Sequence, residues 1–246
     1  MAKGRNWLLL RGLARGVGHW GSFAETIQKH FPEDRFEFLD LPGNGSRHLE
    51  SSPLRISDYV KDLRSRCSYV KNGESFQILS VSLGSMITVE WMREYPHEVK
   101  KAFLTCTSSA GFSPFYHRFY LANVPRGLKL IGQQQDAELW EKTILGMIVN
   151  NQERREAEMP LMIEYSKKYP MNPANVFRQL LAASQYRFPE QPPGDIKLLG
   201  SHGDRLVSAK CTLKIAEQWG LKPQMHPWAG HDVPVDDPQW LLEQLL

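Results

Sequence analysis

The sequence predicts an α/β fold in which a mostly parallel sheet of about six strands is flanked by helices. Short apolar runs alternate with helix-like segments along the chain, and this alternation is typical of parallel sheets covered on both faces. The length of 246 residues suits one such domain with an insertion. The insertion is expected at residues 112–188, which carry helix signals but no convincing strand.

Each expected strand is a short run rich in apolar residues, and helix-like segments follow these runs. Ser57 and Asp237 are polar residues that suit the starts of two helices. The expected strands lie near residues 6–12, 35–40, 76–81, 100–106, 196–201 and 222–227. The expected helices lie near residues 19–30, 56–70, 84–95, 208–219 and 237–246.

The middle of the chain is expected to form a separate helical layer. Asn172 and Pro173 have the form of a helix N-cap followed by proline at the first helical position. The sequence therefore divides into a core, made of residues 1–111 and 189–246, and a helical insertion of residues 112–188.

The composition argues against several classes of protein. The formal net charge of +3 is small, so charge does not favour nucleic acid as a partner. Cys67, Cys106 and Cys211 are widely spaced and odd in number, which predicts no metal site and fits a reducing compartment. The sequence has neither a signal-peptide pattern nor an apolar run near the roughly 18 residues of a membrane span. We expect a cytoplasmic protein without a metal or another cofactor.

The most informative motif lies where the third expected strand gives way to a helix. Residues 76–86 read Phe-Gln-Ile-Leu-Ser-Val-Ser-Leu-Gly-Ser-Met, so Ser80 and Gly84 lie two residues before and after Ser82. A sharp strand-to-helix turn with a serine at its tip needs small residues at both places, because strand and helix nearly touch there. Ser82 is therefore a candidate nucleophile, although an ordinary turn can have the same small residues.

Two later segments supply candidate partners for Ser82. Asp204 lies in the loop after the fifth expected strand, and His231 lies just before the last expected helix. The order serine, acid, histidine is that of the α/β-hydrolase triad and differs from the orders in chymotrypsin-like and subtilisin-like chains. Each residue also has a plainer interpretation, since Asp204 could cap a helix and His231 could be an ordinary loop histidine.

Two N-terminal loops extend the resemblance to α/β-hydrolases. Residues 11–20, Arg-Gly-Leu-Ala-Arg-Gly-Val-Gly-His-Trp, resemble the His-Gly loop that follows an early strand in that family. Residues 36–46, Phe-Glu-Phe-Leu-Asp-Leu-Pro-Gly-Asn-Gly-Ser, resemble the family's Asp-x-Pro-Gly-x-Gly-x-Ser loop. The chain thus resembles α/β-hydrolases over its whole length except the divergent middle. It departs from their usual residues at Arg11 and Asn44, where histidine is frequent, and at Ser80, where glycine is usual.

The resemblance implies a chemical role for each motif. Ser82 would be the nucleophile, His231 the base and Asp204 the acid that orients it. The backbone N–H groups of Leu13 and Leu83 would form the oxyanion hole. Many members insert a helical cap over the site between the sixth and seventh strands of the standard count, and many have two antiparallel strands before the first one expected here. The sequence shows a candidate for the cap but none for the two early strands.

The expected cap is rich in aromatic and methionine side chains. Trp140, Met147 and Phe177 are candidates for lining an apolar acyl pocket, although packing of the cap against the core explains most such residues. Residues 112–188 also contain ten Lys and Arg against seven Asp and Glu. This excess of positive charge would suit an acidic acyl carrier, and solvated helix faces explain it equally well.

The triad alone leaves several functions open. The favoured function is hydrolysis of carboxylic esters of small to medium acyl groups. One alternative is hydrolysis of thioesters or of esters on a carrier protein, as in the methyl ester esterase of pimeloyl carrier protein, a similar capped member. Others are carbon–carbon bond hydrolysis, a lyase reaction, and ligand reception without catalysis. Labelling with a fluorophosphonate would separate an active hydrolase from a receptor.

Overall fold

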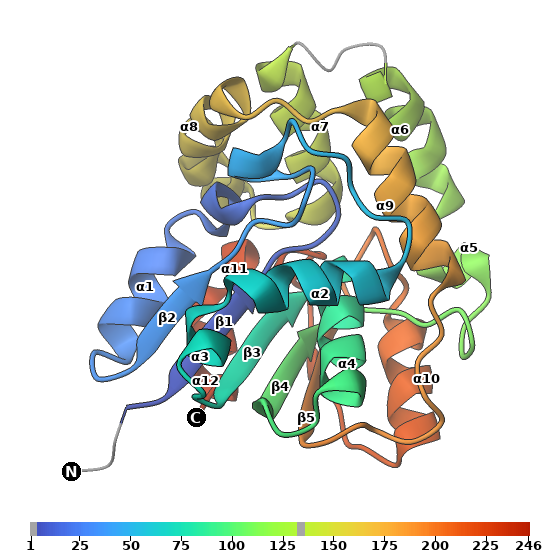
Figure 1. Ribbon diagram of the computed structural model, residues 1–246. Helices are drawn as coiled ribbons and strands as arrows, with labels where there is room; N and C mark the ends of the chain where they lie inside the picture. Colours follow the sequence, from blue (N-terminus) through green and yellow to red (C-terminus); the bar gives the residue numbers. More distant parts are fainter. Residues whose placement is uncertain (1–3, 132–135) are drawn as a thin grey trace.

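The computed structural model describes residues 4–131 and 136–246, and a six-stranded parallel sheet lies at its centre (Figure 1). The strand order is β2-β1-β3-β4-β5-β6, and every neighbouring pair is parallel. The chain passes from β1 to β2 on one side and then to β3 on the other, so the direction of winding reverses between β1 and β3. Open α/β sheets bind ligands outside the carboxyl ends of their strands at such a reversal. The strands are β1 (Asn6–Leu10), β2 (Arg35–Phe38), β3 (Phe76–Val81), β4 (Val99–Thr105), β5 (Ile196–Ser201) and β6 (Gln224–His226).

Helices cover both faces of the sheet. Successive side chains of a strand point to opposite faces, and the strands carry apolar side chains on both. In β1, Leu8 and Leu10 belong to the apolar cluster that includes residues of α2, α4 and α10, whereas Trp7 and Leu9 belong to the cluster that includes residues of α1 and α12. The helices and turns of the core are η1 (Val17–Trp20), α1 (Phe23–His30), η2 (Gly45–Arg47), α2 (Ile56–Arg66), α3 (Ser68–Lys71), α4 (Leu83–Glu94), α10 (Ala209–Trp219), α11 (Val233–Asp236) and α12 (Pro238–Gln244).

A helical insertion separates β4 from β5, and Figure 1 shows α7, α8 and α9 above the sheet. The insertion comprises α5 (Phe115–Arg118), η3 (Leu121–Asn123), α6 (Val124–Ile131), α7 (Ala137–Ile148), α8 (Gln152–Lys168) and α9 (Pro173–Gln185). Asn172 caps α9 by accepting from the N–H of Ala174, with Pro173 at the first helical position, as expected. We call this insertion the cap. Its assignment as a domain of residues 112–188, apart from a core of 1–111 and 189–246, stays a prediction.

The expected elements are all present, with small differences at their ends. The first strand ends at Leu10 rather than residue 12, and the expected helix at 56–70 is divided at Cys67 into α2 and α3. Two short elements, η2 and α11, were not expected from the sequence. Among the helices that the structure describes, none combines the length and the apolar character that crossing a membrane requires.

Candidate active site

Ser82 lies in a strained turn directly after β3. Its backbone has φ 56° and ψ −113°, a conformation that non-glycine residues rarely adopt. Ala14 and Cys106 are the other non-glycine residues with positive φ in the described part of the chain, and they follow β1 and β4. Backbone strain of this kind clusters at functional sites. The three outliers thus mark one region, at the carboxyl ends of adjacent strands.

Close packing around Ser82 explains the small residues of the motif. A Cβ atom at Gly84 would lie 2.7 Å from the carbonyl oxygens of both Leu10 and Arg11, so only glycine fits. Ser80 is fully buried, and its hydroxyl has two acceptors within reach, Ser85 Oγ at 3.2 Å and the Phe103 carbonyl at 3.3 Å. Serine in place of the usual glycine at position 80 therefore fits, because its hydroxyl finds partners inside the core.

Asp204 and His231 meet at the same edge of the sheet. His231 Nδ1 lies 2.7 Å from Asp204 Oδ2, and both residues are buried. The other carboxylate oxygen, Oδ1, accepts from the N–H groups of Leu206 and Val207 at 2.8 and 2.9 Å. Because Nδ1 faces a carboxylate, we assign the ring proton to Nδ1, which leaves Nε2 free to accept a proton.

Ser82 and the Asp204–His231 pair are connected through the end of β4. The Ser82 N–H donates to the Thr105 carbonyl at 2.9 Å. The next residue, Cys106, has its sulfur within 4.8 Å of a carboxylate oxygen of Asp204 and a ring nitrogen of His231. Burial and the neighbouring Asp204 raise the pKa of the Cys106 thiol, so this side chain is an uncharged packing group at neutral pH. Cys106, Asp204 and His231 thus bring three potential ligand atoms together, but two of these residues are already engaged in the Asp204–His231 hydrogen bond.

Arg11 forms a buried ion pair with Asp232. Its Nη1 and Nη2 atoms donate to the two carboxylate oxygens at 2.9 and 2.6 Å. Burial alone would raise the pKa of Asp232, but the charge and hydrogen bonds of Arg11 outweigh it and keep that pKa below its usual range. Asp232 follows His231 directly, so this pair joins the histidine loop to the loop after β1.

The candidate oxyanion donors lie in the two segments that flank Ser82. Leu83 opens α4, and Leu13 lies in the loop after β1, where neighbouring Gly12 packs so closely that a Cβ atom there would be 3.1 Å from Ser82 Cβ. Within the described chain, neither backbone N–H donates a hydrogen bond to a protein acceptor. The fold of the described chain therefore leaves both N–H groups without a protein acceptor, and their role as oxyanion donors stays a prediction.

A second buried ion pair joins the loop after β1 to the cap. Arg15 Nη1 donates to the two oxygens of Glu141 on α7 at 3.0 and 2.7 Å. Burial alone would raise the pKa of Glu141, but Arg15 lowers it to about 2. His19 Nε2 lies 3.3 Å from the same carboxylate, yet burial, aided by the charge of Arg15, lowers the pKa of His19 to about 4. Glu141 is thus charged and His19 neutral at pH 7. Sequence reasoning missed this network, because these residues belong to no motif.

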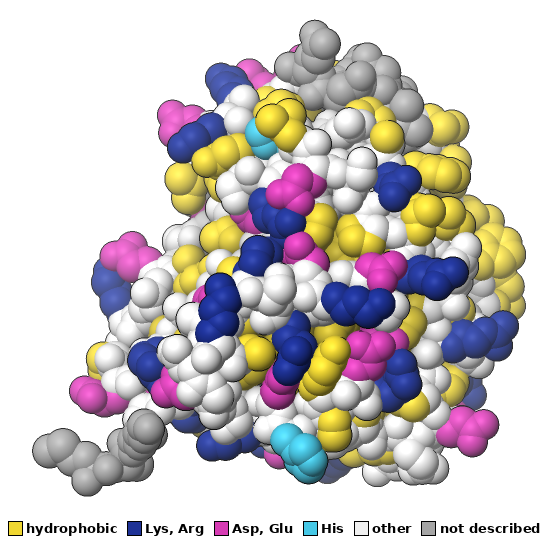
Figure 2. All heavy atoms as spheres, in the orientation of Figure 1, with side chains coloured by type: hydrophobic (Ala, Val, Ile, Leu, Met, Phe, Trp, Pro, Cys, Tyr) yellow, Lys and Arg dark blue, Asp and Glu magenta, His cyan; other side chains and the backbone are white. Residues whose placement is uncertain are grey.

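The three expected pocket residues have different surroundings. Trp140 and Met147 are buried in an apolar cluster that also contains Ala14 and Val235, which lie close in sequence to Leu13 and His231. Phe177, on α9, is 67% exposed and does not belong to this cluster, so its place in an acyl pocket stays a prediction. Figure 2 shows other apolar side chains exposed on that side of the molecule, over α5, α6 and α9.

Comparison with known proteins establishes the fold. Neither a family model nor a curated protein matches the sequence. An α/β-hydrolase fold protein from Chitinophaga pinensis is 13% identical, with a TM-score of 0.75 over 98% of this chain and 87% of that one. A thermophilic esterase from Thermogutta terrifontis is 15% identical, with a TM-score of 0.71 over 99% and 88%. A 2-hydroxy-6-oxo-6-phenylhexa-2,4-dienoate hydrolase from Rhodococcus sp. strain RHA1 is 18% identical, with a TM-score of 0.73 over 98% and 89%. The chain therefore has the α/β-hydrolase fold, as its motifs predict.

Proposed function

We propose that this protein is a serine hydrolase that cleaves carboxylic esters of small to medium acyl groups. The observation that carries the proposal is the 2.7 Å contact between His231 Nδ1 and Asp204 Oδ2, at the sheet edge where Ser82 lies in a strained turn. A serine hydroxyl is a weak nucleophile until a base takes its proton, and an oriented histidine is the usual base. The fold supports this reading, because an esterase is among its structural neighbours.

In the first half of the reaction, Ser82 Oγ attacks the acyl carbonyl carbon while its proton passes to His231 Nε2. Asp204 stabilises the imidazolium that forms. The N–H groups of Leu13 and Leu83 donate to the negative oxygen of the tetrahedral intermediate. The ester C–O bond then breaks, and His231 returns the proton to the departing alcohol.

In the second half, water attacks the carbonyl carbon of the acyl-enzyme and gives a proton to His231. The second tetrahedral intermediate collapses, the carboxylic acid leaves, and the proton returns to Ser82 Oγ. The same groups thus serve both halves of the reaction.

The acyl pocket is proposed to lie against Trp140 and Met147, whose cluster also includes Leu13 at its edge. This placement brings the acyl chain next to the proposed oxyanion hole. Carbon–carbon bond hydrolysis, the activity named for the Rhodococcus neighbour, is an alternative on the same triad.

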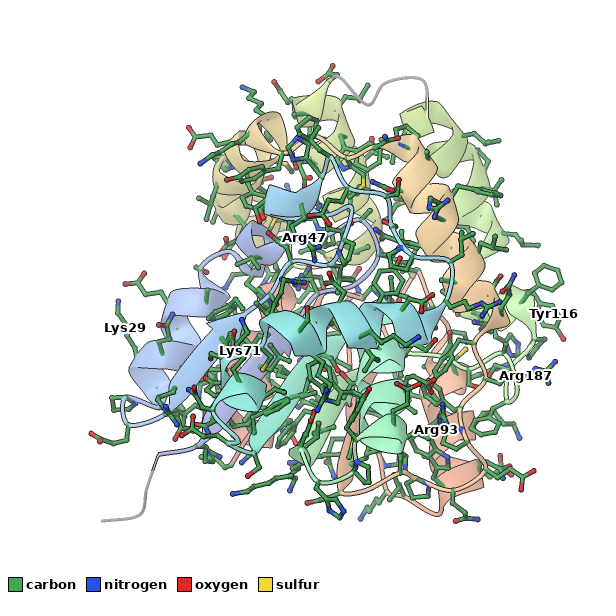
Figure 3. The ribbon with its side chains drawn as sticks, viewed as in Figure 1. Lys29, Arg47, Lys71, Arg93, Tyr116 and Arg187 are labelled. Carbon is green, nitrogen blue, oxygen red and sulfur yellow. The ribbon has the colours of Figure 1, made fainter. Side chains whose placement is uncertain are left out.

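An acidic acyl carrier is a weaker proposal. Arg118 and Arg178, two of the cap's cations, donate to the backbone carbonyls of Ala183 and Ser52, so they serve the fold rather than a free basic surface. Arg187 points away from the molecule beside Tyr116 and is one cation that such a carrier could meet (Figure 3).

The test compares Ser82→Ala with Ser80→Ala. Losing the nucleophile costs on the order of a million-fold in kcat in a serine hydrolase of another fold, so Ser82→Ala should abolish turnover of p-nitrophenyl esters. Ser80→Ala removes only the hydroxyl contacts inside the core and should keep kcat within about tenfold of the wild type. Substantial esterase activity in purified, folded Ser82→Ala would overturn the proposal.

A further inference from the structure

Gln179 is a fully buried residue on cap helix α9, and the hydrogen bonds of its side-chain amide run to loops of the core. Its Oε1 accepts from the N–H of Ala14 at 2.8 Å. Its Nε2 donates to Asn44 Oδ1 at 2.6 Å and to Ser52 Oγ at 3.0 Å. A buried amide with all these partners in place fixes their relative positions, because any shift would leave a polar group unpaired.

Asn44 extends this contact to the other side of Leu13. Its Nδ2 donates to the carbonyl of Arg15 at 2.9 Å and approaches that of Gly12 at 3.5 Å. Gln179 and Asn44 together therefore bind the loop after β1 at three backbone atoms. These atoms flank the Leu13 N–H, which has no acceptor among the described residues.

The turn that carries Asn44 is itself fixed to the core. Arg47, on η2, points toward α2 (Figure 3), and its Nη1 donates to Asp62 at 2.5 Å. The turn that carries Asn44 is thus anchored to α2. Asn44 binds the loop after β1 from the core, and Gln179 binds the same loop from the cap.

The backbone of the loop needs such support. Ala14 has φ 58°, a left-handed conformation that disfavours residues with a Cβ atom. Strain of this kind persists only where the surroundings enforce it. The Ala14 N–H is the atom that Gln179 binds, so losing that bond would let the Ala14 backbone relax and carry Leu13 with it.

We propose that Gln179 and Asn44 are positioning residues for the oxyanion hole, which hold the Leu13 N–H toward the carbonyl oxygen of the substrate. This inference rests on the proposed function, because acyl transfer at Ser82 is what requires an oxyanion donor there. The cap then does more than cover the site, since one of its side chains completes the catalytic geometry.

The experiment compares Gln179→Leu with Asn175→Leu. Asn175 is also a buried amide on α9, but its bonds run to Ser52 and to the carbonyl of Glu50, not to the loop of Leu13. Both variants should lose stability in urea. Only Gln179→Leu should lower kcat, by about ten- to a hundredfold, because losing an oxyanion donor outright costs about a hundred- to a thousandfold. Its KM for a p-nitrophenyl ester should stay within about threefold of the wild type.

Two further readouts separate a positioning role from general damage. A boronic acid that forms a tetrahedral adduct with the nucleophile should bind more weakly to Gln179→Leu by about the same factor as kcat/KM falls. The midpoint of the pH profile of kcat/KM should not move, because Asp204 and His231 keep their contact. Asn44→Ala should reproduce the Gln179→Leu effects, and the double variant should be little worse than either single one.

The outcomes distinguish failure of the positioning role from failure of the proposed ester hydrolysis. If the wild type is active but Gln179→Leu and Asn175→Leu lower kcat equally, the positioning role is overturned and the proposed function stands. The same holds if the losses of kcat in Gln179→Leu and Asn44→Ala multiply in the double variant. A wild type that neither hydrolyses esters nor binds the boronic acid overturns the proposed function and this inference with it.

Discussion

The turn that carries Ser82 and the loop that carries Leu13 lie side by side at the carboxyl end of the sheet, but they are supported differently. The Ser82 turn is held by the core, through the Thr105 carbonyl and the hydroxyls of Ser80, Ser85 and Thr107. The loop after β1 depends on the cap, through Gln179 on α9 and Glu141 on α7. The difference suggests that the core alone shapes the nucleophile, whereas core and cap together shape the proposed oxyanion hole.

Among substitutions that break a contact between the cap and the loop after β1, Glu141→Gln should lower the free energy of unfolding most. The substitution leaves the Arg15 guanidinium buried with its charge uncompensated, which typically costs about 3–5 kcal/mol. Glu138→Gln is the matched control on the same helix, since Glu138 pairs with Lys142 at the surface, where such a pair is worth about 0.5 kcal/mol or less. Urea unfolding of the two variants measures the difference.

Hydrogen exchange then sharpens the comparison between the two segments. In Glu141→Gln, backbone amides of residues 12–19 should exchange faster, while those of 80–88 should keep their protection, because the turn has its own supports. Equal loss of protection in both segments would show that the cap supports the Ser82 turn as well as the loop after β1, so the proposed difference between their supports would be wrong.

His19 gives the same loop a pH dependence. Burial lowers its pKa to about 4, whereas in the unfolded chain it takes up a proton near pH 6.5. Between these values the unfolded state binds more protons, so stability should fall as the pH falls through this window, by at most about 3 kcal/mol from His19. His19→Gln should flatten the dependence between pH 6.5 and 4, and His97→Gln, at an exposed position, should not. Identical urea midpoints against pH for wild type and His19→Gln would contradict the buried, neutral state of the ring.

The smallest expected effect concerns the acyl chain. Met147→Ala should open space in the cap cluster and raise kcat/KM for octanoyl and decanoyl esters relative to acetyl esters. Each buried CH₂ is worth about 0.8 kcal/mol, so a few methylenes amount to tens-fold. Phe177→Ala is the control, because that side chain is 67% exposed. A single common factor for all chain lengths in Met147→Ala would place the acyl pocket elsewhere.

The sequence could predict the Ser82 turn, which the core supports, better than the supports of the loop after β1, which come partly from the cap. The spacing of Ser80, Ser82 and Gly84 reflects local geometry, and the alternating strands and helices fix which loops meet at one edge of the sheet. The fold and the meeting of Asp204 with His231 were therefore accessible from the sequence. The supports of the loop after β1 were not, because Gln179 and Glu141 lie 165 and 126 residues from their partners.

The cap also shows where sequence reasoning fails. A polar residue on a helix is ordinarily expected to face solvent, and an apolar one to face the core. Gln179 and Phe177, two residues apart on α9, reverse this expectation, since Gln179 is fully buried and Phe177 is exposed. Which side of an inserted helix faces the site depends on how the whole insertion packs, and no local pattern records it.

The most direct test of the central claim is labelling of the wild-type protein with a fluorophosphonate, followed by peptide mass spectrometry. We predict one adduct per chain, on the peptide that contains Ser82, and we expect it to be lost in Ser82→Ala and retained in Ser80→Ala. An adduct on another residue, or no adduct in a folded protein, would contradict the assignment of Ser82 as the activated nucleophile.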